Sequence, residues 1–237
     1  MRIRITFAKQ GPLRYTGHLD LHKLWERAAR RAELPLAYSH GFHPQPKMNM
    51  AAALPLGFSS RCEVMDMKLE HEIQLEGLRE KLQQTLPAGI QVLNVESADE
   101  GAPALQTQVA SAEYQVTFAG PVDASELKRK IDSVMEAESL LRERRGKTYD
   151  LRPLIEELCL TPLPTREERG VRVCMRLAAR AGATGRPEEV LDILGIAFEE
   201  THIERTHLIF RSQLEVSWHC WHRFSLGSRR CSFSRRL

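Results

Sequence analysis

Alternating polar and apolar positions predict three strands and two helices in the first hundred residues. Residues 2–8, 62–70 and 90–96 repeat with the period of two that is typical of strands. Apolar side chains recur every three or four positions over 18–33 and 73–86, which predicts amphipathic helices. The order of these elements therefore alternates between strand and helix.

Shorter apolar runs complete this first unit. Residues 34–38 predict a short strand, and the apolar run 48–58 predicts a strand ended by Pro55 and Gly57. Apart from one additional short strand, the resulting order is the β-α-β-β-α-β of a ferredoxin-like domain. We place this domain at residues 1–97. Residues 98–111 are rich in Gly, Pro and Gln and predict a linker.

The same order is expected to recur over residues 112–215. A hairpin is predicted around Gly146, between residues 139–145 and 147–151. Residues 152–164 have no firm place in this scheme. The remaining expected elements are strands at 112–118, 171–177 and 206–212, and helices at 125–137 and 187–194. The predicted fold class is α+β, with two tandem ferredoxin-like domains and a poorly structured basic C-terminal tail.

The tail, residues 216–237, differs from the rest of the chain. It holds five arginines and no acidic residue, and it shows no periodicity after Trp218. A basic arm that binds nucleic acid is one interpretation. A foreign extension, from read-through or a shifted reading frame, is the favoured one, because Trp and Cys are unusual in a solvated arm.

The composition is that of an ordinary soluble protein. Of 237 residues, 42% are hydrophobic and 27% charged, and no long apolar run predicts a membrane span. The first residues lack the apolar stretch of a signal peptide, so we expect a cytoplasmic protein. The five cysteines are far apart without a CxxC pair, which favours reduced thiols over a zinc or iron–sulfur site.

The net charge of +3 is distributed unevenly. Residues 1–47 hold nine Lys/Arg against three acids, which suggests a polyanionic partner at this end. Four cations share one face of the first helix. They could contact successive phosphates of a nucleic acid, or they could simply form the solvated face of the helix. These cations are Lys23, Arg27, Arg30 and Arg31.

Four histidines fall close together in the sequence. His18 and His22 are spaced i, i+4 on the first helix, and His40 and His43 lie in the loop after it. They could bind zinc or iron, or supply an acid/base pair. His22 could instead only pack beside the apolar face. No motif supplies a carboxylate to complete a site, so we predict no metal and no cofactor.

The loop GFHPQPK, residues 41–47, is suited to present groups to a partner. Gly41 permits a positive φ, and Pro44 and Pro46 keep the chain extended. Phe42 and Tyr38 could stack on bases. Alternatively, Phe42 fills the core and the prolines only make a turn.

Several catalytic signatures are absent from the sequence. It contains no Walker A loop, GxGxxG, HExxH or GxSxG motif. The CxxxCxxC triad of radical SAM enzymes is also missing, so this chain does not bind that cluster in the usual way.

The run from Tyr15 to Val64 resembles the N-terminal hallmark of bacterial radical-SAM-linked proteins, an uncharacterised family encoded beside or fused to a cobalamin-type radical SAM protein. The matching positions are His18, Leu19, Asp20, Arg27, Arg31, Tyr38, Ser39, Gly41, Phe42, Pro44, Pro46, Lys47 and the Leu54–Gly57 turn, with Asp150–Pro153, Arg186–Pro187 and Arg205–Thr206 further on. The resemblance covers about residues 1–215.

The sequence departs from the family pattern in the loop and at its end. His40 and His43 stand where the family has Glu and Asn, and Gln45 stands where it has His. His22 is not part of the pattern, so a four-histidine metal site would be peculiar to this chain. The tail after about Val216 matches nothing in the family.

The resemblance implies an accessory protein of a radical SAM modification enzyme that binds or presents a tRNA or rRNA, without a membrane partner. Phosphates would be contacted by Lys23, Arg27, Arg30, Arg31 and Lys47, and bases would stack on Tyr38 and Phe42. The contact loop would be completed by Ser39 and Gly41 and stiffened by Pro44 and Pro46. The start of the helix would be fixed against this loop by His18 and Asp20. Two alternatives remain: an RNA nuclease or transferase that uses His18 and His43, and a pure protein–protein adaptor.

Overall fold

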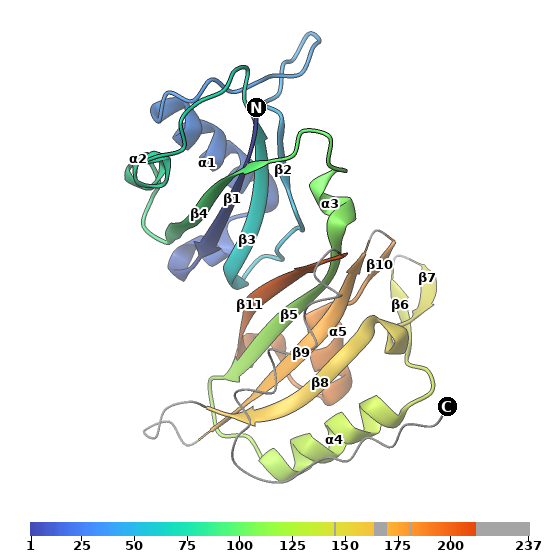
Figure 1. Cartoon of the computed structure of the whole chain (residues 1–237). Coiled ribbons are helices and arrows are strands. Elements are labelled where there is room, and N and C mark those ends of the chain that lie inside the picture. The colour runs from blue at the N-terminus through green and yellow to red at the C-terminus, as the bar shows by residue number, and fades with distance from the viewer. Residues whose placement is uncertain (145, 164–169, 181, 212–237) are drawn as a thin grey trace, which may run out of the picture.

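The computed structural model describes residues 1–144, 146–163, 170–180 and 182–211. The predicted tail, residues 216–237, lies outside the described residues. In the part that is described, a large, mostly antiparallel sheet is combined with five α-helices, which makes the fold α+β (Figure 1).

The main sheet has nine strands, in the order β10-β9-β5-β11-β3-β1-β4, with β2 added to β3 and β8 added to β9. Their bounds are β1 Arg2–Lys9, β2 Met48–Met50, β3 Ser59–Lys68, β4 Ile90–Ala98, β5 Val109–Phe118, β8 Ile155–Pro162, β9 Val171–Arg180, β10 Ala183–Thr184 and β11 Thr201–Phe210. The helices are α1 His18–Arg31, α2 Leu78–Thr85, α3 Leu105–Gln108, α4 Ala124–Glu136 and α5 Pro187–Leu194.

The N-terminal strands pair in the order β4-β1-β3-β2, and every pair is antiparallel. The period-two pattern of β1 places Ile3, Ile5 and Phe7 on one face, where they are fully buried. Helices α1 and α2 cover this face, and Trp25 of α1 meets Phe7 with ring centroids 4.8 Å apart. The strands predicted at both ends of this unit are confirmed.

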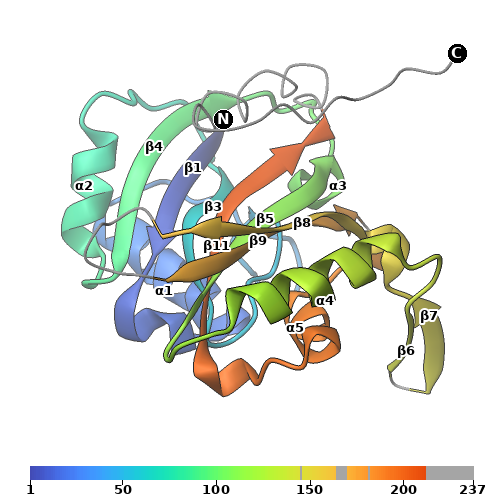
Figure 2. The same cartoon turned by 90° about the horizontal axis from the view of Figure 1, so that it is seen from below.

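The C-terminal strands pair in the order β11-β5-β9-β8, again antiparallel throughout. Helices α4 and α5 lie on one face of these strands (Figure 2). Side chains alternate between the two faces along β5 and β9, and Val116 and Met175 point into the core under the helices. The residues between them therefore place polar side chains on the opposite face. Helix α5 has the bounds that the sequence predicts, residues 187–194.

Strand β11 joins the two halves by pairing in parallel with β3, through Glu204–Ser59 and Arg205–Ser60. The side chains of Arg205 and Glu63 are buried at this junction, where two nitrogens of Arg205 donate to Glu63 at 2.9 and 2.7 Å. Arg205 also donates to the carbonyl of Ala52 at 3.2 Å. The sheet is therefore continuous from β4 to β10.

The predicted hairpin around Gly146 forms, but it stands apart from the main sheet. Strands β6 Leu141–Arg144 and β7 Lys147–Asp150 make a two-stranded sheet of their own. Instead of the hairpin, strand β8 pairs with β9 in the main sheet. Strand β8 comes from the segment 152–164, which the sequence pattern leaves unassigned.

Three other segments differ from the expected elements. Residues 34–38 form only isolated bridges, Leu36–Leu69 and Tyr38–Pro46, instead of a strand. Helix α2 begins later than residue 73, because Gly77 before it has a φ of +72°. The predicted linker 98–111 holds helix α3 and the start of β5, with Leu105 fully buried.

Candidate functional site

Helix α1 separates its apolar and basic side chains. Leu21, Trp25 and Ala28 are buried against the sheet. The four cations on the other side are exposed, as the helical pattern predicts. They are Lys23, Arg27, Arg30 and Arg31.

Acidic neighbours neutralise this basic face only in part. Arg30 lies 3.7 Å from Glu26, an exposed i, i+4 pair that contributes little attraction in water. Lys23, Arg27 and Arg31 form no ion pair with any residue that the structure describes. These three cations are therefore available to an anionic partner.

The loop after α1 is closed at its base and projects at its tip. The amide of Ser39 donates to the carbonyl of Gln45 at 2.8 Å, and the amide of Gln45 donates to Ser39 Oγ at 2.9 Å. Gly41 has a φ of +138°, which a residue with a side chain rarely adopts. Ser39 thus closes the base of the loop through its backbone amide and its hydroxyl oxygen.

Phe42, at the tip of this loop, is fully exposed, with a relative accessibility of 103%. The alternative that Phe42 fills the core is wrong. Tyr38 is half-buried and packs against the N-terminal core, so its ring is less available than that of Phe42. Lys47 is exposed and, with Ser39, lines a surface hollow of about 350 Å³.

The structure brings His18 and His22 together but leaves the loop histidines apart from them. The rings of His18 and His22 are 4.7 Å apart at the start of α1. Burial, and then the proximity of His18, lower the pKa of His22. The 14-residue helix is about 20 Å long, and His40 and His43 lie in the loop that follows its C-terminal end, whereas His18 and His22 lie in its first two turns.

This separation bears on two of the predicted roles. His18 and His43 do not face a common point, so the structure gives no support to that acid/base pair. His18 and Asp20 are both exposed at the start of α1 and do not fix it against the loop at the far end. Across the described ranges, no group of three His, Cys, Asp or Glu side chains is placed to hold a metal ion.

Ser59 and His202 form a serine–histidine pair at the junction of β3 and β11, with Ser59 Oγ 3.0 Å from His202 Nε2. Arg14 Nη1 lies 3.1 Å from His202 Nδ1. A guanidinium only donates, so Nδ1 accepts and the ring proton resides on Nε2. His202 therefore donates to Ser59 and does not act as its general base.

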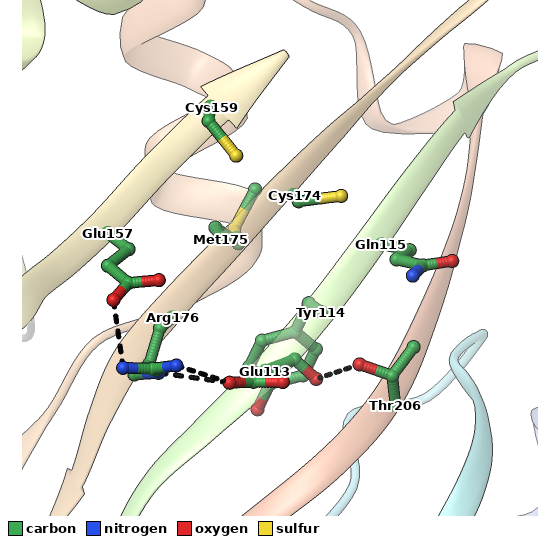
Figure 3. A pocket seen from close by; sticks show the side chains of 9 residues that line it. All are labelled: Glu113, Tyr114, Gln115, Glu157, Cys159, Cys174, Met175, Arg176 and Thr206. Atoms are coloured by element: carbon green, nitrogen blue, oxygen red, sulfur yellow. Dashed lines mark hydrogen bonds and ion pairs between the residues drawn. The ribbon is translucent and has the colours of Figure 1, made fainter. Parts of the chain in front are cut away.

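The face of the C-terminal sheet that carries no helix holds a small pocket (Figure 3). Glu113 on β5 lies at its centre and accepts two hydrogen bonds from Arg176, at 3.0 and 2.7 Å. Arg176 also donates to Glu157 at 2.9 Å, and His207 lies 3.1 Å from Glu113. Burial would raise the pKa of Glu113, but the hydrogen bonds from His207 and Arg176 outweigh it and lower the pKa.

The same pocket contains two thiols, Cys159 and Cys174, that face each other across β8 and β9. The sequence pattern predicts separate thiols, since the two cysteines are distant in the chain and the pattern does not predict β8. Only the register of β8 on β9 reveals this pair.

Comparison with known protein families gives a match to most of the chain. A family model described as "Uncharacterized protein conserved in bacteria (DUF2344)" matches residues 2–187. No curated protein matches the chain. In the described residues, no helix is both long and apolar enough to cross a membrane.

Two solved structures show weak similarity to the chain. A chain of a Cbf5-Nop10-Gar1 complex is 12% identical, with a TM-score of 0.43, and the match covers 87% of this chain but 48% of that chain. A protein assigned to the dyp-type peroxidases, from Shewanella oneidensis, is 9% identical, with a TM-score of 0.22 and coverage of 88% and 91%. The chain thus spans about half the length of the first of these structures.

Proposed function

Because the chain belongs to the DUF2344 family of uncharacterized proteins conserved in bacteria, we propose for it the role that its resemblance to radical-SAM-linked proteins implies. In this role it is an accessory protein of a radical SAM modification enzyme and binds or presents an RNA substrate, a tRNA or an rRNA. Its partner is the radical SAM protein, and the chain itself performs no catalytic step.

One observation supports this proposal most strongly. Lys23, Arg27 and Arg31 extend along the exposed face of α1 without an acidic partner in the described part of the chain. Cations that have no partner gain more from phosphates than paired cations, since they have no ion pair to break. Phe42 adds an exposed ring that a base is able to stack on.

The proposal extends to the fold of the two halves. We take each half as one ferredoxin-like unit, with orders β4-β1-β3-β2 and β11-β5-β9-β8. The first unit would hold the RNA contacts on α1 and its loop. The second would stay free for the protein partner.

RNA binding is tested with the full chain, bulk tRNA and an rRNA fragment over a series of salt concentrations. We expect affinity to fall steeply with salt, because each phosphate contact releases counterions. Arg27→Ala/Arg31→Ala should reduce the slope of log K against log salt by about 2, near one unit per lost contact. Phe42→Ala should weaken binding by roughly 1–3 kcal/mol with the slope unchanged.

The matched control is Lys128→Ala/Lys130→Ala, which removes two exposed cations from α4. Both lysines already have acidic partners, Asp132 and Glu126. This control should leave the affinity and the slope unchanged. If neither RNA binds even at low salt, or if the α4 variant loses as much affinity as the α1 variant, RNA binding through α1 is rejected.

The partner is tested separately, by capture of the radical SAM protein from nuclease-treated lysate. Direct association survives nuclease treatment. If the radical SAM protein is captured but no RNA binds in the salt series, the chain acts as a protein–protein adaptor.

A further inference from the structure

Two cysteines from different strands meet in the pocket of Figure 3. Cys159 and Cys174 are direct partners in the antiparallel β8–β9 pairing. Directly opposed residues in such a pair have Cα atoms about 4.5–5.5 Å apart, which is inside the range of about 4.4–6.8 Å that a disulfide requires. The backbone therefore already permits a bond between the two sulfurs.

Neighbouring groups distinguish the two thiols. Arg172 Nε donates to Thr161 Oγ1 at 3.1 Å, which leaves the Thr161 hydroxyl hydrogen free for Cys174 Sγ at 3.3 Å. The neighbouring Cys159 thiol lowers the pKa of Cys174, and the Thr161 and Arg172 contacts add to this effect against burial. The neighbouring Cys174 thiol, followed by burial, raises the pKa of Cys159.

We propose that Cys174 and Cys159 form a peroxide-reactive thiol pair, in which Cys174 is the nucleophile and Cys159 the resolving thiol. The Cys174 thiolate attacks one oxygen of hydrogen peroxide, the O–O bond breaks, and a sulfenic acid and hydroxide form. The Cys159 thiol then attacks the Cys174 sulfur. The S–S bond forms, and the S–O bond breaks with release of water. Peroxide takes the two electrons lost by the two thiols.

The size of the pocket selects the class of oxidant. It offers about 20 Å³ to the centre of a water-sized molecule, and Cys174 is only 6% exposed. That is little more than one water position. Hydrogen peroxide is small enough to reach Cys174, whereas a bulky disulfide such as oxidised glutathione is not.

Cys62 provides an internal comparison. Burial, and then the charge of Glu63, raise the pKa of the Cys62 thiol to about 12. We expect it to stay unreactive at neutral pH. The proposal does not depend on RNA binding, because the pocket lies on β5, β8, β9 and β11 and the basic helix belongs to the other half.

The test uses the full chain with Cys220→Ser and Cys231→Ser, so that the tail cysteines do not compete. The protein is treated with hydrogen peroxide, unfolded in the presence of an alkylating agent, digested and mapped by mass spectrometry. We expect a linked Cys159–Cys174 peptide that dithiothreitol releases, with Cys62 still alkylated as a free thiol. Oxidised glutathione should give much less of this peptide.

Variants assign the two roles. Cys159→Ser is unable to resolve, so a sulfenic acid should accumulate on Cys174 after peroxide treatment and be trapped by dimedone present while the protein is unfolded. Thr161→Val removes one donor and should slow oxidation of Cys174 by hydrogen peroxide at pH 7 by about fivefold. Cys174→Ser should leave Cys159 unoxidised.

The unsubstituted pair decides the outcome even if a variant folds poorly. If peroxide yields no Cys159–Cys174 peptide, or if peroxide oxidises Cys174 no faster than Cys62 at pH 7, the proposal is wrong. A dimedone adduct on Cys159 in place of Cys174 would overturn the assignment of the roles.

Discussion

Individual side chains on the open face of the C-terminal sheet show what local sequence does not reveal. Glu113, Arg176 and His207 come from β5, β9 and β11, and they meet only because these strands are neighbours. By contrast, the pairing of His18 with His22 follows from helical spacing alone and was predictable. Contacts within one element can be predicted, whereas contacts between strands require the register.

The Glu113 network should make stability depend on acid pH. The folded pKa of Glu113 is lowered, so its stabilising contribution is present above the unfolded pKa of about 4.3 and is lost as pH falls through the folded pKa. Glu113→Gln lacks this contribution. The difference in unfolding free energy between wild type and variant, measured in urea, should therefore shrink from pH 6 to pH 3.

Glu157→Gln is the matched control, because it removes an exposed carboxylate from the same Arg176. Its effect should stay below about 1 kcal/mol, as for other exposed pairs. A gap between wild type and Glu113→Gln that stays constant over this pH range would contradict the argument.

Whole elements were predictable where their ends and periodicity are clear. Helix α5 begins with Pro187 and ends before Gly195, the two signals that fix its bounds. Strand β8 was missed because a register shift between Ile155 and Glu157 interrupts its alternation. The hairpin β6–β7 has no buried side, since its residues are exposed or half-buried, and it therefore does not join the main sheet.

The end of α5 gives a prediction at this scale. Gly195 has a φ of +70°, so Gly195→Ala places a side chain in the left-handed region at a cost of about 1–2 kcal/mol. Among the described residues beyond its chain neighbours, only Lys130 Nζ lies near the new Cβ, at 3.5 Å, and this end of a long side chain can move aside. The loss of stability would therefore reflect backbone strain and not a steric clash. Gly120→Ala, where φ is ordinary and no described atom lies within 4 Å, should be nearly neutral in urea unfolding. Equal effects would refute this reading of the helix end.

At the scale of the molecule, the sequence predicts two similar halves but not how they join. The parallel contact of β11 with β3 links segments more than 140 residues apart, and no local pattern encodes it. Part of the N-terminal half also enters the second core, as Leu54 and Phe58 pack there. The basic face of α1, by contrast, is visible in the sequence and is exposed as predicted.

The buried pair of Glu63 and Arg205 should couple the stability of the two halves. Glu63→Gln leaves the Arg205 charge buried without its counter-ion, so we expect a loss of about 3–5 kcal/mol. Because the pair joins β3 to β11, the slowest amides of β1 and of β5 should lose protection together in native-state hydrogen exchange. Arg61→Ala removes the exposed partner of Glu204 at the same junction and should cost less than about 1 kcal/mol. Loss of protection in one half alone would mean that the halves unfold independently and that this ion pair does not couple them.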